Sequence, residues 1–147
     1  MLISLLPDVN GSRCILTFDE SGQWLRATWC GFISMEEAML GSGRYLHALA
    51  EVHCPYLLND NTALLGPWFD SIEWLEQVWV PQAMQLGLRY VAHVVQADSL
   101  SDCITVNFRG PKAGLPELQI FQQVADAEAW LRSCQRKVAK TENTSAG

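Results

Sequence analysis

The sequence predicts an α/β domain with a single mixed, largely parallel sheet. The first observation behind this prediction is a hairpin signal near the N-terminus. The second is the alternation, after the hairpin, of apolar strand-like runs with segments of helical periodicity. Strands joined through helices pair in parallel by right-handed crossovers. We therefore expect a sheet that starts antiparallel, continues parallel and carries its helices mainly on one face.

The hairpin is predicted over residues 14–18 and 24–29. Both runs are rich in β-branched and aromatic residues, and the residues between them, Asp19 to Gly22, are turn formers. Alternate side chains of each run then face opposite sides of the sheet.

A helix is predicted from Ser34 to about Val52. Ser34 and Glu37 have the spacing of a capping box, in which two side chains accept hydrogen bonds from otherwise unpaired backbone N–H groups. Gly41 and Gly43 interrupt the helix, and each costs up to about 1 kcal/mol relative to alanine. Small residues at these positions indicate close approach to the sheet or to another helix.

Two buried strands are predicted next, over residues 56–60 and 90–95, because each is a short, nearly continuous apolar run. The polar residues Asn59 to Thr62 then lie at the carboxyl end of the first strand. Between the two strands, a helix over residues 72–79 begins at an Asp-Ser cap. Pro81 either kinks this helix or starts a new short turn.

The last regular elements predicted are a strand over residues 118–121 and a helix that opens at Asp126. Before them, residues 98–109 fit either a strand or a short helix. Residues 110–116 are rich in glycine and proline and predict a loop.

Length and patterning indicate a single domain. A chain of 147 residues can bury a sizeable core, and no linker divides it. Residues 1–140 are therefore expected to form one domain. Residues 141–147 are polar and are expected to be a disordered tail.

Composition and charge exclude several classes of protein. The net charge is −6, and the ten Lys and Arg residues are dispersed except near the C-terminus, which argues against nucleic-acid binding. No apolar run approaches the ~20 residues that span a bilayer, and residues 1–6 are too short and uncharged for a signal peptide. The five cysteines include no Cys-x-x-Cys pair, so we expect reduced thiols in a cytoplasmic protein.

The titratable residues form no recognisable catalytic set, and neither a cofactor nor a metal is expected. His47 and His53 are six residues apart, which turns them about 120° away from each other on a helix. His93 lies in a predicted buried strand, where its imidazole needs a hydrogen-bond partner or stays uncharged. It is either a structural histidine or a contact in a pocket, and a Cys–His nucleophile formed in space stays open.

Aromatic residues exceed what one core needs. Six tryptophans stand among 147 residues, and Trp68, Phe69, Trp74 and Trp79 cluster around the predicted second helix, with Trp74 off its apolar stripe. Aromatic side chains outside a core commonly anchor interfaces. These four residues predict either the interface of a homodimer or other protein complex, which we favour, or the lining of a pocket for a small apolar or lipid-like ligand.

Several local signatures resemble the SpoIIAA-like branch of the STAS-type fold, which shares features with CRAL-TRIO domains. They are Trp29-Cys30-Gly31 before the helix start at residues 34–37, the strands at residues 57–60 and 90–94, and the closing segment of Phe121 and residues 127–131. The resemblance covers residues 13 to 135. It implies a STAS-like regulatory or protein-interaction module without enzymatic activity.

In the bacterial anti-sigma-factor antagonists of the STAS group, a phosphorylatable serine stands at the start of the helix after a central strand. The comparable stretch here is Asn59-Asp60-Asn61-Thr62, which has no serine. Thr62 is the nearest hydroxyl, and a phosphate there would add about −1.5 to −2 charges. Asp60 and Thr62, together with the buried His93, are the candidate pocket or switch residues.

Overall fold

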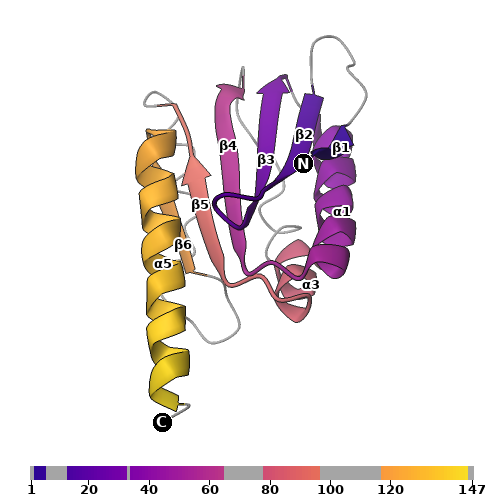
Figure 1. Cartoon of the computed structure of the whole chain (residues 1–147). Helices are drawn as coiled ribbons and strands as arrows, with labels where there is room; N and C mark the ends of the chain where they lie inside the picture. Colours follow the sequence, from indigo (N-terminus) through magenta and orange to yellow (C-terminus); the bar gives the residue numbers. More distant parts are fainter. Residues whose placement is uncertain (1, 6–12, 33, 65–77, 97–116, 146–147) are drawn as a thin grey trace.

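The sheet follows the order of the sequence. The structure is a computed structural model that describes residues 2–5, 13–32, 34–64, 78–96 and 117–145 (Figure 1). Within these residues, one six-stranded sheet contains the strands β1 (Leu2–Leu5), β2 (Arg13–Asp19), β3 (Trp24–Gly31), β4 (Tyr56–Leu64), β5 (Tyr90–Val94) and β6 (Glu117–Phe121). The pairs β1–β2 and β2–β3 are antiparallel, and the three pairs from β3 to β6 are parallel. The predicted mixed, largely parallel sheet is confirmed.

The predicted hairpin is formed by β2 and β3, and its turn is organised by one carboxylate. Asp19 Oδ1 accepts hydrogen bonds from the backbone N–H groups of Ser21 and Gly22, each at 3.0 Å. The bond from Gly22, with the hydroxyl of Ser21, lowers the pKa of Asp19. Gln23 follows with a positive φ of 62°, which turns the chain into β3. The indole of Trp24 then folds directly under Gly22 and is fully buried.

The first helix, α1 (Met35–Val52), begins and ends as predicted. Ser34 Oγ accepts the N–H of Glu37 at 3.1 Å, and Glu37 Oε1 accepts the N–H of Ser34 at 3.4 Å, which completes the capping box. The helix ends at His53, which adopts a left-handed conformation and donates its N–H to the carbonyl of Leu49. Both ends of α1 therefore have local signals that fix its length.

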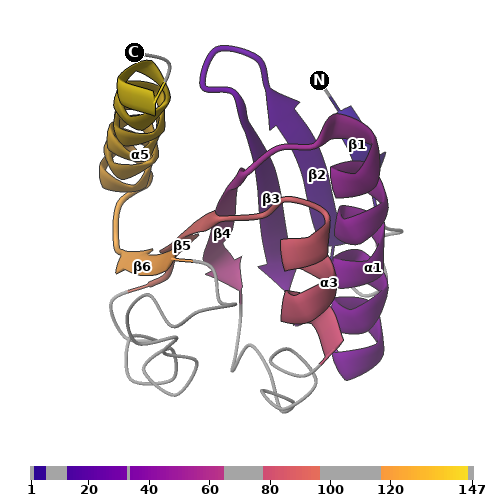
Figure 2. The same cartoon turned by 90° about the horizontal axis from the view of Figure 1, so that it is seen from below.

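The helices cover both faces of the sheet. Figure 2 shows α1 and α3 (Val80–Gln85) on one face and α5 (Val124–Ser145) on the other. The first two lie in connections between parallel strands, which pass over the same face. The expectation of helices mainly on one face therefore holds for α1 and α3. α5 follows the last strand and connects no further strand, so this rule does not place it.

Ring contacts fix α5 on its face. Trp130 lies edge-on to Tyr90 with ring centroids 6.3 Å apart, and 5.8 Å from Phe121. The guanidinium of Arg132 lies 5.3 Å from the ring centroid of Trp24. We call this side of the sheet the α5 face and the opposite side the α1 face. Side chains of both faces belong to the core, whose largest fully buried members are Trp24, Leu25, Leu49, Leu58, Leu88 and Leu131.

The structure differs from the sequence-based expectations at both ends. β1 was not predicted, because a four-residue apolar run is too short to distinguish from a disordered end. At the other end, α5 continues to Ser145, so the disordered tail expected from residue 141 is wrong as far as that residue. Residues 141–146 include no glycine or proline, so the sequence has no helix-breaking residue before Gly147.

Pro81 stands in the first turn of α3, directly after Val78 and Trp79, which are π-helical. The choice between a kink and a new turn at Pro81 stays a prediction, because residues 65–77 lie outside the described residues. The helix expected over residues 72–79 lies mostly outside the described residues, as do residues 98–109 and 110–116.

Replacement of Gly22 by alanine is expected to destabilise the fold. A Cβ added at Gly22 would lie 2.4 Å from ring carbons of Trp24, which is fully buried. Such overpacking costs about 1–3 kcal/mol. Urea denaturation of Gly22→Ala measures this cost. The control is Glu20→Ala, an exposed position of the same turn, which should stay within about 0.5 kcal/mol of the unaltered chain. Equal stabilities of the two variants would contradict the packing argument.

Candidate functional site

Polar side chains are buried within the central parallel strands β4 and β5. Among the described residues, the buried polar side chains are Ser42, Asp60, Asn61 and His93. Three of these four lie within the strands: Asp60 and Asn61 in the middle of β4, which runs on to Leu64 past the expected strand end, and His93 one residue before the end of β5. Alternation along the strands divides this polar cluster between the two faces of the sheet.

The α5 face holds an ion pair at the predicted residue Asp60, and the predicted residue Thr62 donates to the same carboxylate. Arg26 donates to Asp60 Oδ2 at 2.9 Å, while Asp60 Oδ1 accepts the backbone N–H of Thr62 at 3.0 Å and its hydroxyl at 2.7 Å. Burial alone would raise the pKa of Asp60, but the bonds from Thr62 and Arg26 outweigh it and lower the pKa. Both carboxylate oxygens are therefore occupied by donors.

The proposed switch at Thr62 stays a prediction, with one new constraint. The Thr62 hydroxyl points at the Asp60 carboxylate. A phosphate on this oxygen would lie against a negative charge, so it would have to break the contact with Asp60.

The α1 face holds a hydrogen-bond chain with a defined direction. An indole N–H can only donate, so the 2.9 Å bond from Trp29 Nε1 fixes Asn59 Oδ1 as the acceptor. The Asn59 Nδ2 group must then donate, and it lies 3.2 Å from Asn61 Oδ1 and 2.8 Å from His93 Nδ1. His93 Nδ1 is therefore the acceptor, which places the ring proton on Nε2. The chain ends at Asn61 Nδ2, a buried donor that has no hydrogen-bond partner among the described residues.

His93 is a neutral imidazole in this arrangement. Burial lowers its pKa from 6.5 to about 4, so the ring carries no charge at neutral pH. The hydrogen bond from Asn59 agrees with the first of the two expectations for His93, a structural histidine of the core.

Three of the four described cysteines, Cys14, Cys54 and Cys134, are poorly suited to nucleophilic chemistry. Burial raises the pKa of Cys14 to about 12, and it also raises the pKa values of Cys54 and Cys134. Thiols of raised pKa stay protonated and are weak nucleophiles. Within the described residues, no three His, Cys, Asp or Glu side chains gather as metal ligands would. Cys103 lies outside the described residues.

The predicted aromatic surface is only partly described. Trp68, Phe69 and Trp74 lie outside the described residues, so their role stays a prediction. Trp79 is half-buried: its ring lies 5.5 Å from that of Tyr45, and its Nε1 donates to the carbonyl of Ser42 at 3.2 Å. These contacts are internal and attach the start of α3 to α1.

Other apolar side chains are exposed on and near α1. The large exposed hydrophobic residues of the described chain are Phe32 (71% exposed), Leu40 (53%), Val78 (40%) and Met39 (38%). Two of them lie on α1, Phe32 precedes it, and Val78 adjoins the α1-packed Trp79. We call these four residues the α1 surface.

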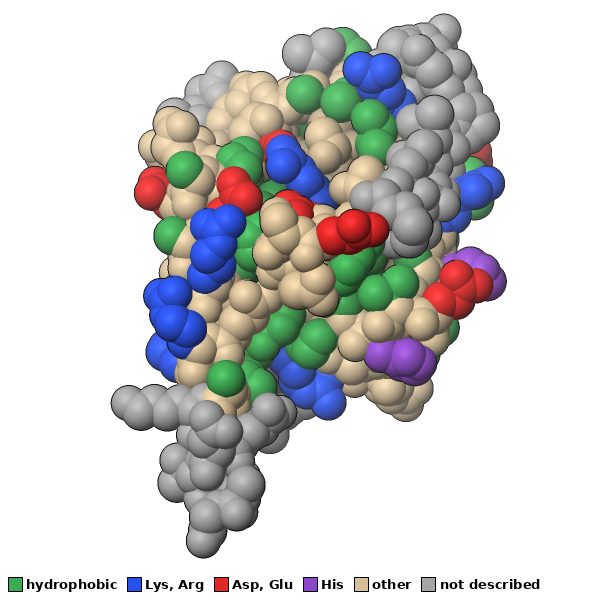
Figure 3. All heavy atoms as spheres, viewed as in Figure 1, with side chains coloured by type: hydrophobic (Ala, Val, Ile, Leu, Met, Phe, Trp, Pro, Cys, Tyr) green, Lys and Arg blue, Asp and Glu red, His purple; other side chains and the backbone are tan. Residues whose placement is uncertain are grey.

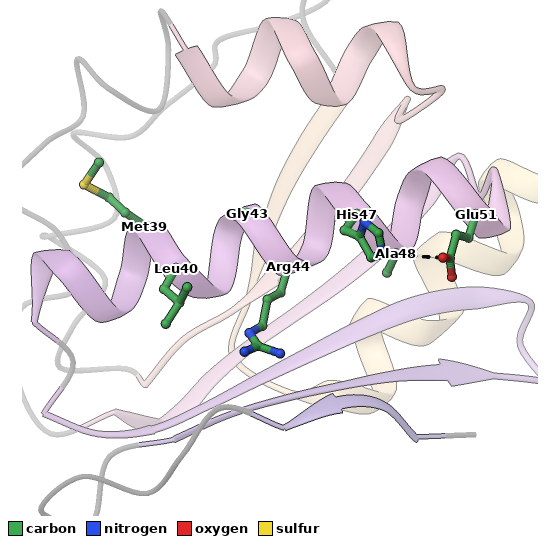
Figure 4. Close-up of a pocket in the computed structure, with 7 residues that line it drawn as sticks. All are labelled: Met39, Leu40, Gly43, Arg44, His47, Ala48 and Glu51. Carbon is green, nitrogen blue, oxygen red and sulfur yellow. Dashed lines mark ion pairs between the residues drawn. The ribbon is translucent and has the colours of Figure 1, made fainter.

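A hollow of about 570 Å³ lies along the same helix. Figure 4 shows described residues that line it, all of which belong to α1: Met39, Leu40, Gly43, Arg44, His47, Ala48 and Glu51. His47 and Glu51 form an exposed ion pair at 3.4 Å on its rim. The lining is thus apolar near the start of α1 and polar towards its end.

Sequence reasoning missed the α1 surface and half of the polar cluster. The signal for the surface was present, since Leu40 and Tyr45 are five residues apart and so point to nearly opposite sides of a helix. Polar residues at alternate positions of an apolar strand, Asn59 and Asn61, were the signal for the cluster. Their partners, Arg26 and Trp29, come from another strand and required the sheet register.

Basic side chains gather elsewhere. Figure 3 shows Lys and Arg side chains along α5, where Arg132, Arg136 and Lys137 lie. Arg132 already contacts Glu128 at 3.8 Å and the ring of Trp24. Among the described helices, none is long and apolar enough to cross a membrane.

Fold and side chains together define a mixed α/β domain with an apolar surface around one helix. No protein-family model matches the sequence, and no curated protein matches it. A solved structure is similar: an uncharacterized protein from the DUF3478 family with a SpoIIAA-like fold, from Shewanella loihica PV-4. Its sequence identity is 21%, the match covers 80% of this chain and 91% of that chain, and the TM-score is 0.49. Its described fold is the one that the present sequence resembles.

Protonation of His93 is expected to weaken the fold in acid. The unfolded chain takes up a proton near pH 6.5, whereas the folded chain resists it until about pH 4. Falling pH therefore favours the unfolded chain, by up to roughly 3 kcal/mol. Urea denaturation of the unaltered chain and of His93→Asn, which keeps an acceptor for Asn59, measures the difference. The two pH profiles should diverge between these values, and parallel profiles would contradict a neutral His93.

The ion pair at Asp60 gives a second expectation. Asp60→Asn keeps an acceptor for Thr62 but leaves Arg26 without a carboxylate, a loss of about 1.5–3 kcal/mol for a charged hydrogen bond. Thr62→Val removes one hydroxyl donor and should cost about 1 kcal/mol. Thermal or urea denaturation ranks the two variants. A larger loss for Thr62→Val would show that the pair with Arg26 contributes little.

Proposed function

We propose that the protein is a non-enzymatic, STAS-like interaction module that self-associates through the α1 surface. The observation that carries this proposal is the exposure of Phe32, Leu40, Met39 and Val78 around a single helix. An apolar patch exposed on one side of a domain marks an interaction site more often than a chance arrangement.

The inner side of α1 does not need these residues. Tyr45, Ala48 and Leu49 are buried and supply the contact with the core, while Trp79 packs on the same side of the helix. The exposed Leu40 and Phe32 add nothing to this contact. Their burial against another molecule would instead contribute roughly 25 cal/mol per Å² of apolar area removed from water.

The polar cluster supports a binding role over catalysis. Asp60 is tied by Arg26 and Thr62, and His93 accepts from Asn59. These contacts link β3 to β4 and β4 to β5. We assign them to stability and assign contact with partners to the α1 surface.

Leu40→Glu is expected to abolish self-association. A carboxylate at the centre of an apolar interface must be desolvated without a partner, which should weaken association by about tenfold or more. Light scattering and sedimentation over a wide range of protein concentration measure the molecular mass. The unaltered chain should pass from monomer to dimer as concentration rises, and Leu40→Glu should stay monomeric.

The control is Ala129→Glu, which adds the same charge at an exposed position of α5. It should dimerise like the unaltered chain. A monomeric unaltered chain at all concentrations, or equal dimerisation of the Leu40→Glu variant, would refute the proposed function. Circular dichroism of each variant checks that α1 is retained.

A further inference from the structure

A glycine is among the residues that line the hollow on α1. Gly43 is exposed, and a Cβ added there would have nothing within 4 Å. The residues three and four positions away on the helix surface, Met39, Leu40 and His47, line the hollow around it. In Figure 4 Gly43 lies between these side chains, so its missing side chain leaves an open space on the outer side of the helix.

The side chain of Leu40, about one helical turn before Gly43, projects into solvent. Leu40 is 53% exposed, although leucine is usually buried. Together with Glu36, Gly43 and His47 it forms a stripe with spacings of four, three and four residues. This spacing is that of the contact positions in helices that pack side chains of one helix into holes of another.

The stripe is complementary to itself. A two-fold axis midway between residues 41 and 42 of two antiparallel helices brings position 40 of each copy opposite position 43 of the other. The same operation brings Glu36 opposite His47 of the second copy. A symmetric dimer uses one patch twice, so a surface that carries both a projection and a hole suits this symmetry.

We infer that two copies of the chain pack α1 against α1 in antiparallel orientation, with Leu40 of each copy filling the hollow over Gly43 of the other. This inference rests on the proposed self-association and specifies its partner, its symmetry and its central contact. Gly43 lets the two helices approach closely, because no side chain separates the backbones there.

The polar residues of the stripe agree with this orientation. Glu36 is exposed in the first turn of α1, and His47 is exposed in its last third. Antiparallel packing places the acidic residue of one copy beside the histidine of the other, whereas parallel packing in register would place Glu36 beside Glu36 and His47 beside His47. Unlike groups oppose each other only in the antiparallel arrangement.

Variants that exchange the leucine at position 40 and the glycine at position 43 test the inference. Gly43→Leu fills the hollow from within the chain and leaves Leu40 of the second copy without space. Leu40→Gly removes the projection. The double variant, Leu40→Gly with Gly43→Leu, restores one projection opposite one hole, because the two-fold axis relates the same two positions.

We expect each single variant to raise the dimer dissociation constant by about tenfold or more, and the double variant to return it to within about threefold of the unaltered value. Sedimentation equilibrium measures the constants. Gly43→Leu replaces a glycine inside a helix and should strengthen the helix itself, so loss of its dimer cannot result from unfolding.

Two results would overturn the inference in different ways. A tighter dimer for Gly43→Leu, or no recovery in the double variant, would show that α1 associates by unspecific apolar contact, and self-association through the α1 surface would stand. A monomeric unaltered chain would remove both the proposed function and this arrangement.

Discussion

Successive side chains of β4 point to opposite faces of the sheet, so each face must supply hydrogen-bond partners for its own polar side chains. Asp60 points to the α5 face, and its neighbours Asn59 and Asn61 point to the α1 face. Since helices cover both faces, each buried polar group needs a partner from its own face. β3 supplies both, with Arg26 on one side and Trp29 on the other. A shift of β3 by one residue would exchange these partners, so the two contacts fix the register of the parallel pair from opposite sides.

The two glycines of α1 serve opposite sides of the same helix. Gly41 is buried on the inner side, while Gly43 is exposed on the outer side. Residues two apart on a helix point about 200° away from each other, so both cannot serve one contact. Trp79 and Tyr45 meet on the inner side, where close packing is needed. The helix therefore combines a packed inner side with an outer side shaped for contact.

Much of the fold could be predicted because its signals are local. The capping box at Ser34 and Glu37, the turn after Asp19 and the apolar strands all depend on residues close in sequence. The polar cluster could be predicted only in part, because Arg26 meets Asp60 across 34 positions of sequence. Trp79 was expected at an interface, yet its half-buried position depends on Ser42 and Tyr45, which sequence spacing does not bring to it.

The placement of α5 has a consequence for the order of folding during synthesis. This helix comes after all six described strands, yet Trp130 and Leu131 complete the layer over β4, β5 and β6. Until they emerge from the ribosome, Tyr56, Tyr90 and Phe121 line a sheet face without its covering helix. The hairpin and α1 carry their own local signals and can form early. Closure of the other face must wait for the final part of the chain, so an interrupted polypeptide would expose a sticky aromatic layer to the cell.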